Sequence, residues 1–420
     1  MPWKQGSLVA LLAVAFVAPV SADEASVALA DFMARRQETQ RLAAEAFAAM
    51  PLPPAVAEKA GEKPCRDSDA DGLSDCVETG TGVFVNRYDT GTSRSNPDTD
   101  GDGLRDGDEV LGVAGFDLPG LGVSPLRKDL LLEYDWLDDA NDCGAHSHKP
   151  SPGVLAKVAQ VFAAAPVTNP DGSTGIHVVQ DIGQGGALLG GNRLDSVPAV
   201  LPGTFDATHR EIKRKHFAPA RSGYFHYVVF AHRYAGGSNS SGYAEIVGDD
   251  ALVTLYCFAP NDTYVANTIV HEVGHNLGLL HGGFEACNGK PSYSSLMNYR
   301  YQFAGIDAQC TGNGSATAAN FSSGGRMPLD ENAIDERVGV CGSPAIDWNG
   351  NGVVEPVVSY DLNASYNGEC GSPLRVLDDF DDWSNLEFNG ILDGTYNLKS
   401  VQTEVACGGA PAPTFGARRM

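Results

Sequence analysis

The sequence predicts an α/β (α+β) domain that extends over about residues 126–400. Two observations point to this class. Runs rich in Val, Tyr and Phe, which are typical of strands, alternate with an amphipathic helical pattern and a second, longer helix. Apolar residues make up 43% of the 420-residue chain, an ordinary value for a globular protein with a buried core. We therefore expect a twisted mixed sheet with helices packed against it.

The expected elements follow one another in a regular order. Strands are expected at 129–137, 176–181, 224–231 and 251–258, and helices at 154–165 and 263–277. Asn261 or Asp262 can cap the last of these helices. From about residue 282 the chain is rich in Gly, Asn and Ser, which predicts a loop-rich C-terminal subdomain. Residues 401–420 are expected to form a tail.

The N-terminus has the pattern of an export signal. Lys4 supplies a positive charge, Leu8–Val20 form an apolar stretch of 13 residues, and Ala22 is a small residue suited to cleavage. Thirteen apolar residues are too few to span a bilayer, so we expect residues 1–22 to be a cleaved signal peptide of a secreted protein. No later segment is long and apolar enough to cross a membrane. Residues 23–64 are expected to form a helical pro-segment and linker.

The chain is strongly acidic, with a net charge of −24. This charge argues against nucleic acid as a partner, because phosphate binding requires a basic face. Ten Asp and two Glu lie between Asp67 and Glu109. Such local concentration predicts that residues 65–112 bind cations, although a solvated acidic linker is the alternative interpretation.

Nine cysteines in an exported chain predict disulfides. Sequence proximity favours the pairs Cys65–Cys76, Cys287–Cys310 and Cys341–Cys370, and leaves Cys143, Cys257 and Cys407. At least one thiol is then unpaired. Cys65 is also a candidate thiolate that blocks a metal site in a latent form, although its position beside an acidic loop favours a disulfide.

The strongest functional motif is a histidine cluster in the predicted helix at 263–277. His271 and His275 are four residues apart, so their side chains point about 40° apart on a helix and can bind one ion. Glu272 can reach a water on that ion. Gly278 accepts the left-handed conformation that ends a helix, which allows His281 to turn back to the same ion. Three imidazoles with an open fourth position are typical of catalytic Zn²⁺.

This run resembles the signature of the metzincin clan of zinc metallopeptidases, in which a methionine turn follows the histidines, and it looks like a group of secreted bacterial members of that clan. Here Ser295-Leu-Met297-Asn-Tyr299 is similar to that turn. The resemblance implies that Met297 forms an apolar floor under the imidazoles and that Tyr299 stabilises the oxyanion. It also implies a protein or peptide substrate that lies antiparallel to an edge strand, at Ala251–Leu255 or Tyr243–Val247.

Two acidic segments repeat one pattern of alternating carboxylates. The predicted ligands are Asp67, Asp69, Asp71, Asp75 and Glu78 in the first segment and Asp98, Asp100, Asp102, Asp106 and Glu109 in the second. Gly72 and Gly103 permit the sharp turn, and oxygen ligands in this number suit Ca²⁺. The spacing resembles thrombospondin type 3 repeats. A third segment with fewer charges, comprising Asp347, Asn349, Asn351 and Glu355, is a further calcium candidate.

These motifs predict a zinc-dependent endopeptidase in which Glu272 activates the attacking water. The alternative is a calcium-dependent adhesion or binding protein whose metalloprotease domain is inactive. The acidic repeats favour that alternative, and the intact Glu272 opposes it.

Overall fold

In the computed structural model, the described residues are 65–113, 116–139, 144–195, 197–201, 205–234, 240–256, 261–388 and 401–403. The expected signal peptide, the pro-segment and residues 404–420 of the expected tail lie outside them. In the described part of the chain, no helix has the length and apolar character needed to cross a membrane.

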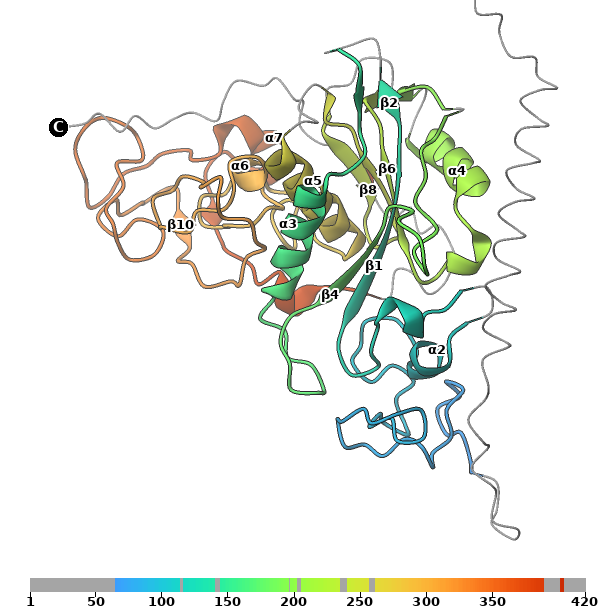
Figure 1. The fold of residues 1–420 in the computed structure, drawn as a ribbon. Helices are drawn as coiled ribbons and strands as arrows, with labels where there is room; N and C mark the ends of the chain where they lie inside the picture. Colours follow the sequence, from blue (N-terminus) through green and yellow to red (C-terminus); the bar gives the residue numbers. More distant parts are fainter. Residues whose placement is uncertain are drawn as a thin grey trace, which may run out of the picture. The chain divides into compact units, whose positions relative to one another are not determined.

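A six-stranded mixed sheet forms the centre of the domain (Figure 1). Its strands lie in the order β12 (Val401–Thr403), β8 (Gly242–Glu245), β9 (Asp250–Val253), β6 (His226–Phe230), β1 (Asp129–Trp136) and β4 (His177–Asp181). The strands β4, β1, β6 and β9 are parallel, whereas β8 is antiparallel to both of its neighbours, β9 and β12. The fold is therefore mixed α/β, as the sequence predicts.

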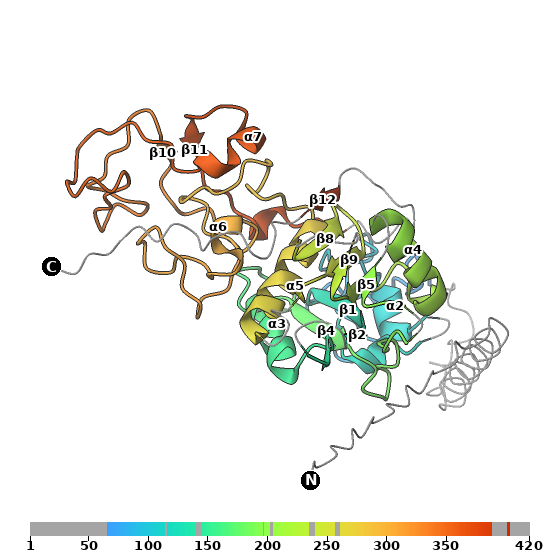
Figure 2. The ribbon, with the colours of Figure 1, turned by 90° about the horizontal axis from the view of Figure 1, so that it is seen from above.

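Helices cover both faces of this sheet, as Figure 2 shows from above. On one face, Leu132 of β1 belongs to the same buried cluster as residues of α3 (Pro152–Ala163) and α5 (Asp262–Asn276). On the other face, Leu131 clusters with Ile212 of α4 (Phe205–His216). All eight residues of β1 are buried, which explains its continuous apolar run at Leu130–Leu132.

The capping residues fix where the two helices on the first face begin. Asn261 caps α5, because its side chain accepts hydrogen bonds from the backbone N–H groups of Thr263 and Tyr264. Ser151 caps α3 and also donates to the Asp262 carboxylate across 2.8 Å. This bond joins the starts of α3 and α5, so α5 is held against α3 from its first turn.

Short elements complete the described chain. They are α2 (Asp106–Leu111), β2 (Asp138–Asp139), β3 (His146–Ser147), β5 (Val200–Leu201), β7 (Arg233–Tyr234), α6 (Tyr299–Gln302), β10 (Leu329–Asp330), α7 (Asn367–Cys370), β11 (Val376–Leu377), and the 3₁₀ turns η1 (Pro119–Leu121), η2 (Pro219–Arg221), η4 (Ala364–Tyr366) and η5 (Trp383–Asn385). Between residues 277 and 388 no described helix or strand exceeds four residues.

One of the two strands expected to bind substrate is excluded by the sheet order. The strand β9 lies between β6 and β8, so the expectation for Ala251–Leu255 is wrong. The strand β9 is apolar because it lies in the interior of the sheet, and its apolar character therefore does not indicate peptide binding. The segment Tyr243–Val247 overlaps β8, whose outer edge pairs with β12.

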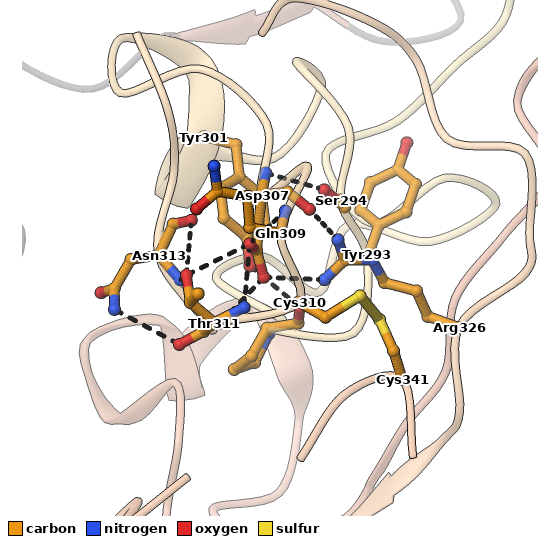
Figure 3. Close-up of polar contacts among 12 residues, drawn as sticks. Tyr293, Ser294, Tyr301, Asp307, Gln309, Cys310, Thr311, Asn313, Arg326 and Cys341 are labelled. Carbon is orange, nitrogen blue, oxygen red and sulfur yellow. Dashed lines mark hydrogen bonds and ion pairs between the residues drawn. A yellow bond between two sulfur atoms is a disulfide. The ribbon is translucent and has the colours of Figure 1, made fainter. Parts of the chain in front are cut away.

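Buried polar groups organise the loop-rich part after α5. Figure 3 shows Asp307, whose carboxylate accepts hydrogen bonds from the backbone of Thr311 and Gly312 and from the Arg326 guanidinium. Burial opposes ionisation of Asp307, but these three donors outweigh it and hold its pKa below the usual value. The Asp307 backbone N–H also donates to Ser294 Oγ. Hydrogen bonds to the charged Asp307 thus hold these loops together where regular secondary structure is short.

The disulfides correct two of the three expected pairs. Cys65 bonds Cys76, as predicted, and is therefore not a free thiolate in this structure. Cys287 bonds Cys370, and Cys310 bonds Cys341, so the pairs Cys287–Cys310 and Cys341–Cys370 are wrong. The reason is packing: Cys287 and Cys370 both lie in a buried cluster with Leu362 and Leu377, which brings together residues far apart in the chain.

Candidate functional site

Three histidines converge at the carboxyl end of α5. His271 and His275 lie one turn apart on this helix, and His281 follows its end; none is more than 3% exposed. Their ligand atoms all lie within 4.8 Å of one another. The Nε2 atoms of His275 and His281 are 3.1 Å apart. Two nitrogen ligands of a tetrahedral zinc ion lie about 3.3 Å apart, so the three side chains fit such an ion.

Backbone carbonyls orient two of these imidazoles. His271 Nδ1 is 2.7 Å from the carbonyl oxygen of Leu296, and His275 Nδ1 is 2.7 Å from that of Leu279. An N–H on each Nδ1 leaves the Nε2 lone pair for a metal. Metal-binding histidines commonly donate their other ring N–H to a backbone carbonyl in this way.

Gly278 redirects the chain where α5 ends. Its φ of +92° is in the left-handed region, and its N–H donates to the carbonyl of His275 across 2.9 Å. The next N–H, of Leu279, donates to the carbonyl of Gly274. These bonds end the helix and return the chain, so that His281 comes back beside His275.

Glu272 of α5 is buried where this helix faces the strand β8. Its side chain is fully buried, and its carboxylate lies against Gly242 of β8 so closely that a Cβ atom at position 242 would overlap Glu272 Oε1. The strand β8 therefore passes directly beside the residue expected to act as the general base.

Met297 and Tyr299 both lie close to the histidines. Met297 is fully buried, and a Cβ atom on Gly274 would overlap its sulfur, so it packs under α5 within one turn of His271 and His275. The half-buried Tyr299 ring has its centroid 4.2 Å from that of His281 and 5.9 Å from that of His271. Its backbone N–H donates to Asn288 Oδ1.

A buried carboxylate that the sequence analysis missed holds the loop before Met297. Asp382 accepts hydrogen bonds from the Tyr293 hydroxyl (2.7 Å), Ser295 Oγ (2.6 Å) and the Ser322 backbone N–H (2.9 Å). Burial raises its pKa to about 7, against these three donors. Nothing in the local sequence distinguishes Asp382 from the neighbouring aspartates, because its partners are about 60 to 90 positions away.

The three acidic loops share one hydrogen-bond pattern. In each, the first aspartate accepts backbone N–H groups from the residues three and five positions later. The pairs are Ala70 and Gly72 on Asp67, Gly101 and Gly103 on Asp98, and Gly350 and Gly352 on Asp347. These bonds curl each loop so that alternate side chains turn inward. The carboxylates of Asp67, Asp69 and Asp71 form one candidate metal group, and those of Asp98, Asp100 and Asp102 another.

The structure brings the first two loops together at a further carboxylate group. Glu78 of the first segment lies with Asp71 and with Asp106 of the second segment, and all three are buried. Burial, then the charges of Asp69 and Asp71, raises the pKa of Glu78 to about 7. Burial likewise raises the pKa of Asp106 to about 7. Carboxylates this close favour either protons or a cation.

The remaining predicted acidic ligands of these two loops have different surroundings. Asp75 accepts hydrogen bonds from the Ser68 backbone N–H and hydroxyl, both at 2.9 Å, which closes the first loop. Glu109 is buried, and burial and then the charge of Asp102 raise its pKa well above the usual value. Asp102 also accepts from the backbone N–H of Asp129, the first residue of β1. The second loop is thus anchored directly to the central sheet.

In the third loop, amide side chains converge on Glu355. Asn349 and Asn351 both donate to Glu355 Oε2, across 3.2 and 2.8 Å. The buried Glu336, which the sequence analysis missed, accepts from the backbone N–H groups of Trp348 and Glu355 and clamps both ends of the loop.

Of three comparisons with known proteins, only the one with curated protein sequences finds a match. No protein-family profile matches it, and no solved structure matches it. A curated relative, Metallopeptidase AprA of Pseudomonas marginalis, is 30% identical over 122 residues, which are 26% of this chain and 25% of that protein. The matched part is thus about a quarter of the relative's length. With the three converging histidines, this match supports a metalloprotease relationship for the chain.

Proposed function

We propose that the chain is a secreted, zinc-dependent endopeptidase of the metzincin type that calcium stabilises. The observation that carries the proposal is the convergence of His271, His275 and His281 at a buried point next to Glu272. When bound, zinc would lower the pKa of water to about 7 and polarise the peptide carbonyl. The chain's own residues would position the substrate and move the proton.

Glu272 would serve as the general base and then as the general acid. Its carboxylate would accept a proton from the water that attacks the carbonyl carbon, and would then deliver it to the leaving amine nitrogen. The C–O bond to the water oxygen forms first, and the C–N bond then breaks as its nitrogen receives the proton, so one water is consumed and no further reactant is needed. Packing against Gly242 restricts the carboxylate to one side of the helix, which favours this role.

Tyr299 would stabilise the developing negative charge. Its ring already lies beside those of His271 and His281, and its hydroxyl would donate a hydrogen bond to the carbonyl oxygen. Met297 would act as a positioning residue, because it packs under the helix turn that carries two of the histidines.

A peptide substrate would bind as an antiparallel strand on β8. This strand passes beside Glu272, and its outer edge accepts an antiparallel partner in this structure, Val401–Thr403, which pairs with Tyr243–Glu245. A peptide would take the place of that segment, with backbone hydrogen bonds that tolerate many side chains.

Calcium in the acidic loops would order segments that have few apolar contacts of their own. The anchoring of Asp102 to the first residue of β1 would transmit this order to the central sheet. Secretion through residues 1–22 would supply the extracellular calcium that such loops require. Mass spectrometry of the secreted protein should find Ala22 absent and Cys65 bonded to Cys76.

Metal exchange tests the enzymatic proposal. The purified full chain should cleave casein, lose this activity when a zinc-selective chelator removes the metal, and regain it with Zn²⁺ in the presence of unchanged Ca²⁺. Cleavage that is undiminished in the zinc-free protein would exclude the proposed chemistry.

A further inference from the structure

A second group of three histidines lies outside the α5 centre. His146 and His148 belong to the chain around β3, and His232 follows the end of β6. Their ligand atoms lie within 4.8 Å of one another, the same limit that the α5 histidines satisfy. We propose that these residues, with Asp139, form a second metal site of the zinc class, which we name the His146 site.

The distances within the His146 site suit a shared ion. His148 Nε2 lies 3.3 Å from His232 Nδ1. This separation equals the distance of about 3.3 Å expected between two nitrogen ligands of tetrahedral zinc. The ring centroid of His146 lies 4.7 Å from that of His148 and 5.4 Å from that of His232, so all three rings meet around one point.

The orientation of His146 gives a second, independent indication. Its Nδ1 is 2.7 Å from the carbonyl oxygen of Gly144, so the N–H belongs on Nδ1 and the lone pair on Nε2. This Nε2 atom is buried, and it has no hydrogen-bond partner among the described residues. A buried polar atom without a partner is costly, and a metal ion would satisfy it.

The Asp139 carboxylate lies next to the three histidines and is the candidate fourth ligand. It is buried and lies 3.9 Å from His232 Nδ1. With an ion bound, three imidazoles and this carboxylate would fill four coordination positions, which is typical of a structural zinc rather than a catalytic one. The α5 centre differs, because its three histidines leave a position for water.

The site would tie together segments that have little regular structure. Asp139 and His146 lie opposite each other in a hairpin whose paired strands, β2 and β3, have two residues each. His232 is 84 positions beyond His148. A metal bridge would hold this hairpin against the carboxyl end of β6. A cavity of about 260 Å³ is lined by His148 and by Ser147 and Asp262, among others.

A purely protein-based cluster of stacked rings is the alternative. One hydrogen bond between His148 and His232 would explain their 3.3 Å separation. It would leave the buried Nε2 of His146 unsatisfied by the described residues. A metal ion would account for the convergence of the three histidines and for the buried Nε2 of His146.

Metal counting tests the His146 site independently of enzymatic activity. We would purify the full chain without chelator and measure zinc by mass spectrometry. The wild type should hold two zinc ions per chain, the double variant His271→Ala/His275→Ala should hold one, and His146→Ala should also hold one. His177→Ala is the matched control, because its half-exposed imidazole lies outside both clusters; it should retain two ions.

The outcomes separate this inference from the proposed function. One ion in the wild type that disappears in the His271→Ala/His275→Ala variant would overturn the His146 site and leave the catalytic site intact. One ion that disappears only in His146→Ala would support the His146 site and contradict the α5 centre. Two ions in His146→Ala would overturn the inference. Since His148 and His232 are more buried, His146 is the substitution least prone to unfold the chain.

Discussion

The carboxylate of Glu272 lies against Gly242 so closely that a Cβ atom at position 242 would overlap Glu272 Oε1 and crowd the carbonyl oxygen of Leu252. This contact joins the metal-motif helix α5 to the strand β8 beside it. It explains why a glycine begins this strand, although strands usually disfavour that residue. The contact also makes the position of the proposed general base sensitive to a substitution on a different element.

Gly242→Ala should therefore displace the Glu272 carboxylate and lower kcat/KM. General base catalysis contributes about 10²–10⁴-fold, and we expect a loss of at least about tenfold with zinc content unchanged. Casein or fluorogenic peptide cleavage measures the rate. Gly325→Ala is the matched control, because a Cβ there meets no atom within 4 Å. Equal activity of the two variants would contradict the proposed role of the contact.

Gly278→Ala should weaken zinc binding, because φ of +92° disfavours alanine by about 1–2 kcal/mol. The strain falls on the turn that returns His281 to the site. The expected result is a zinc dissociation constant roughly tenfold higher than that of the wild type, measured by chelator competition. An unchanged constant would mean that the conformation of Gly278 does not determine where His281 lies.

Tyr299→Phe should lower kcat by about 10²-fold with little change in KM or zinc content. The substitution removes the hydroxyl and keeps the ring packed beside His281. Steady-state kinetics separate the two constants. If KM rises while kcat stays constant, Tyr299 binds substrate and does not stabilise the oxyanion.

Calcium binding should weaken as the pH falls below about 7. In the metal-free protein the pKa values of Glu78 and Asp106 are raised to about 7, so protons occupy these carboxylates below that pH and compete with the cation. Between pH 8 and pH 6 each group should cost about tenfold in affinity. Isothermal titration with Ca²⁺ at the two pH values measures this. An affinity that is independent of pH would exclude these two residues as ligands.

Much of the fold and of the proposed zinc site could be predicted from local patterns. The expected strand at 129–137 corresponds to β1, which carries a continuous apolar run, and the expected helix at 263–277 corresponds to α5, which a capping residue precedes. The histidines of α5 are close in sequence, so helix geometry alone places two of them together. Local patterns fail where the partner is distant in the chain.

Three features illustrate that failure. The helix α4 was not predicted, because its residues are mostly polar and only a few contact the sheet. The expected pair Cys287–Cys310 is wrong, since the partner of Cys287 is Cys370, 83 positions away. The His146 site was missed for the same reason: His232 reaches it only through the parallel pairing of β1 and β6.

The replacement of Glu272 tests the central claim most directly. Glu272→Gln preserves the size of the side chain and removes the proton acceptor, and Glu211→Gln on the exposed surface of α4 is the matched control. We predict that Glu272→Gln lowers casein cleavage by at least about 10²-fold while retaining zinc and the wild-type melting temperature, and that Glu211→Gln cleaves like the wild type. Undiminished cleavage by Glu272→Gln would contradict the account, and an absence of cleavage in the zinc-loaded wild type would instead favour a calcium-dependent binding protein.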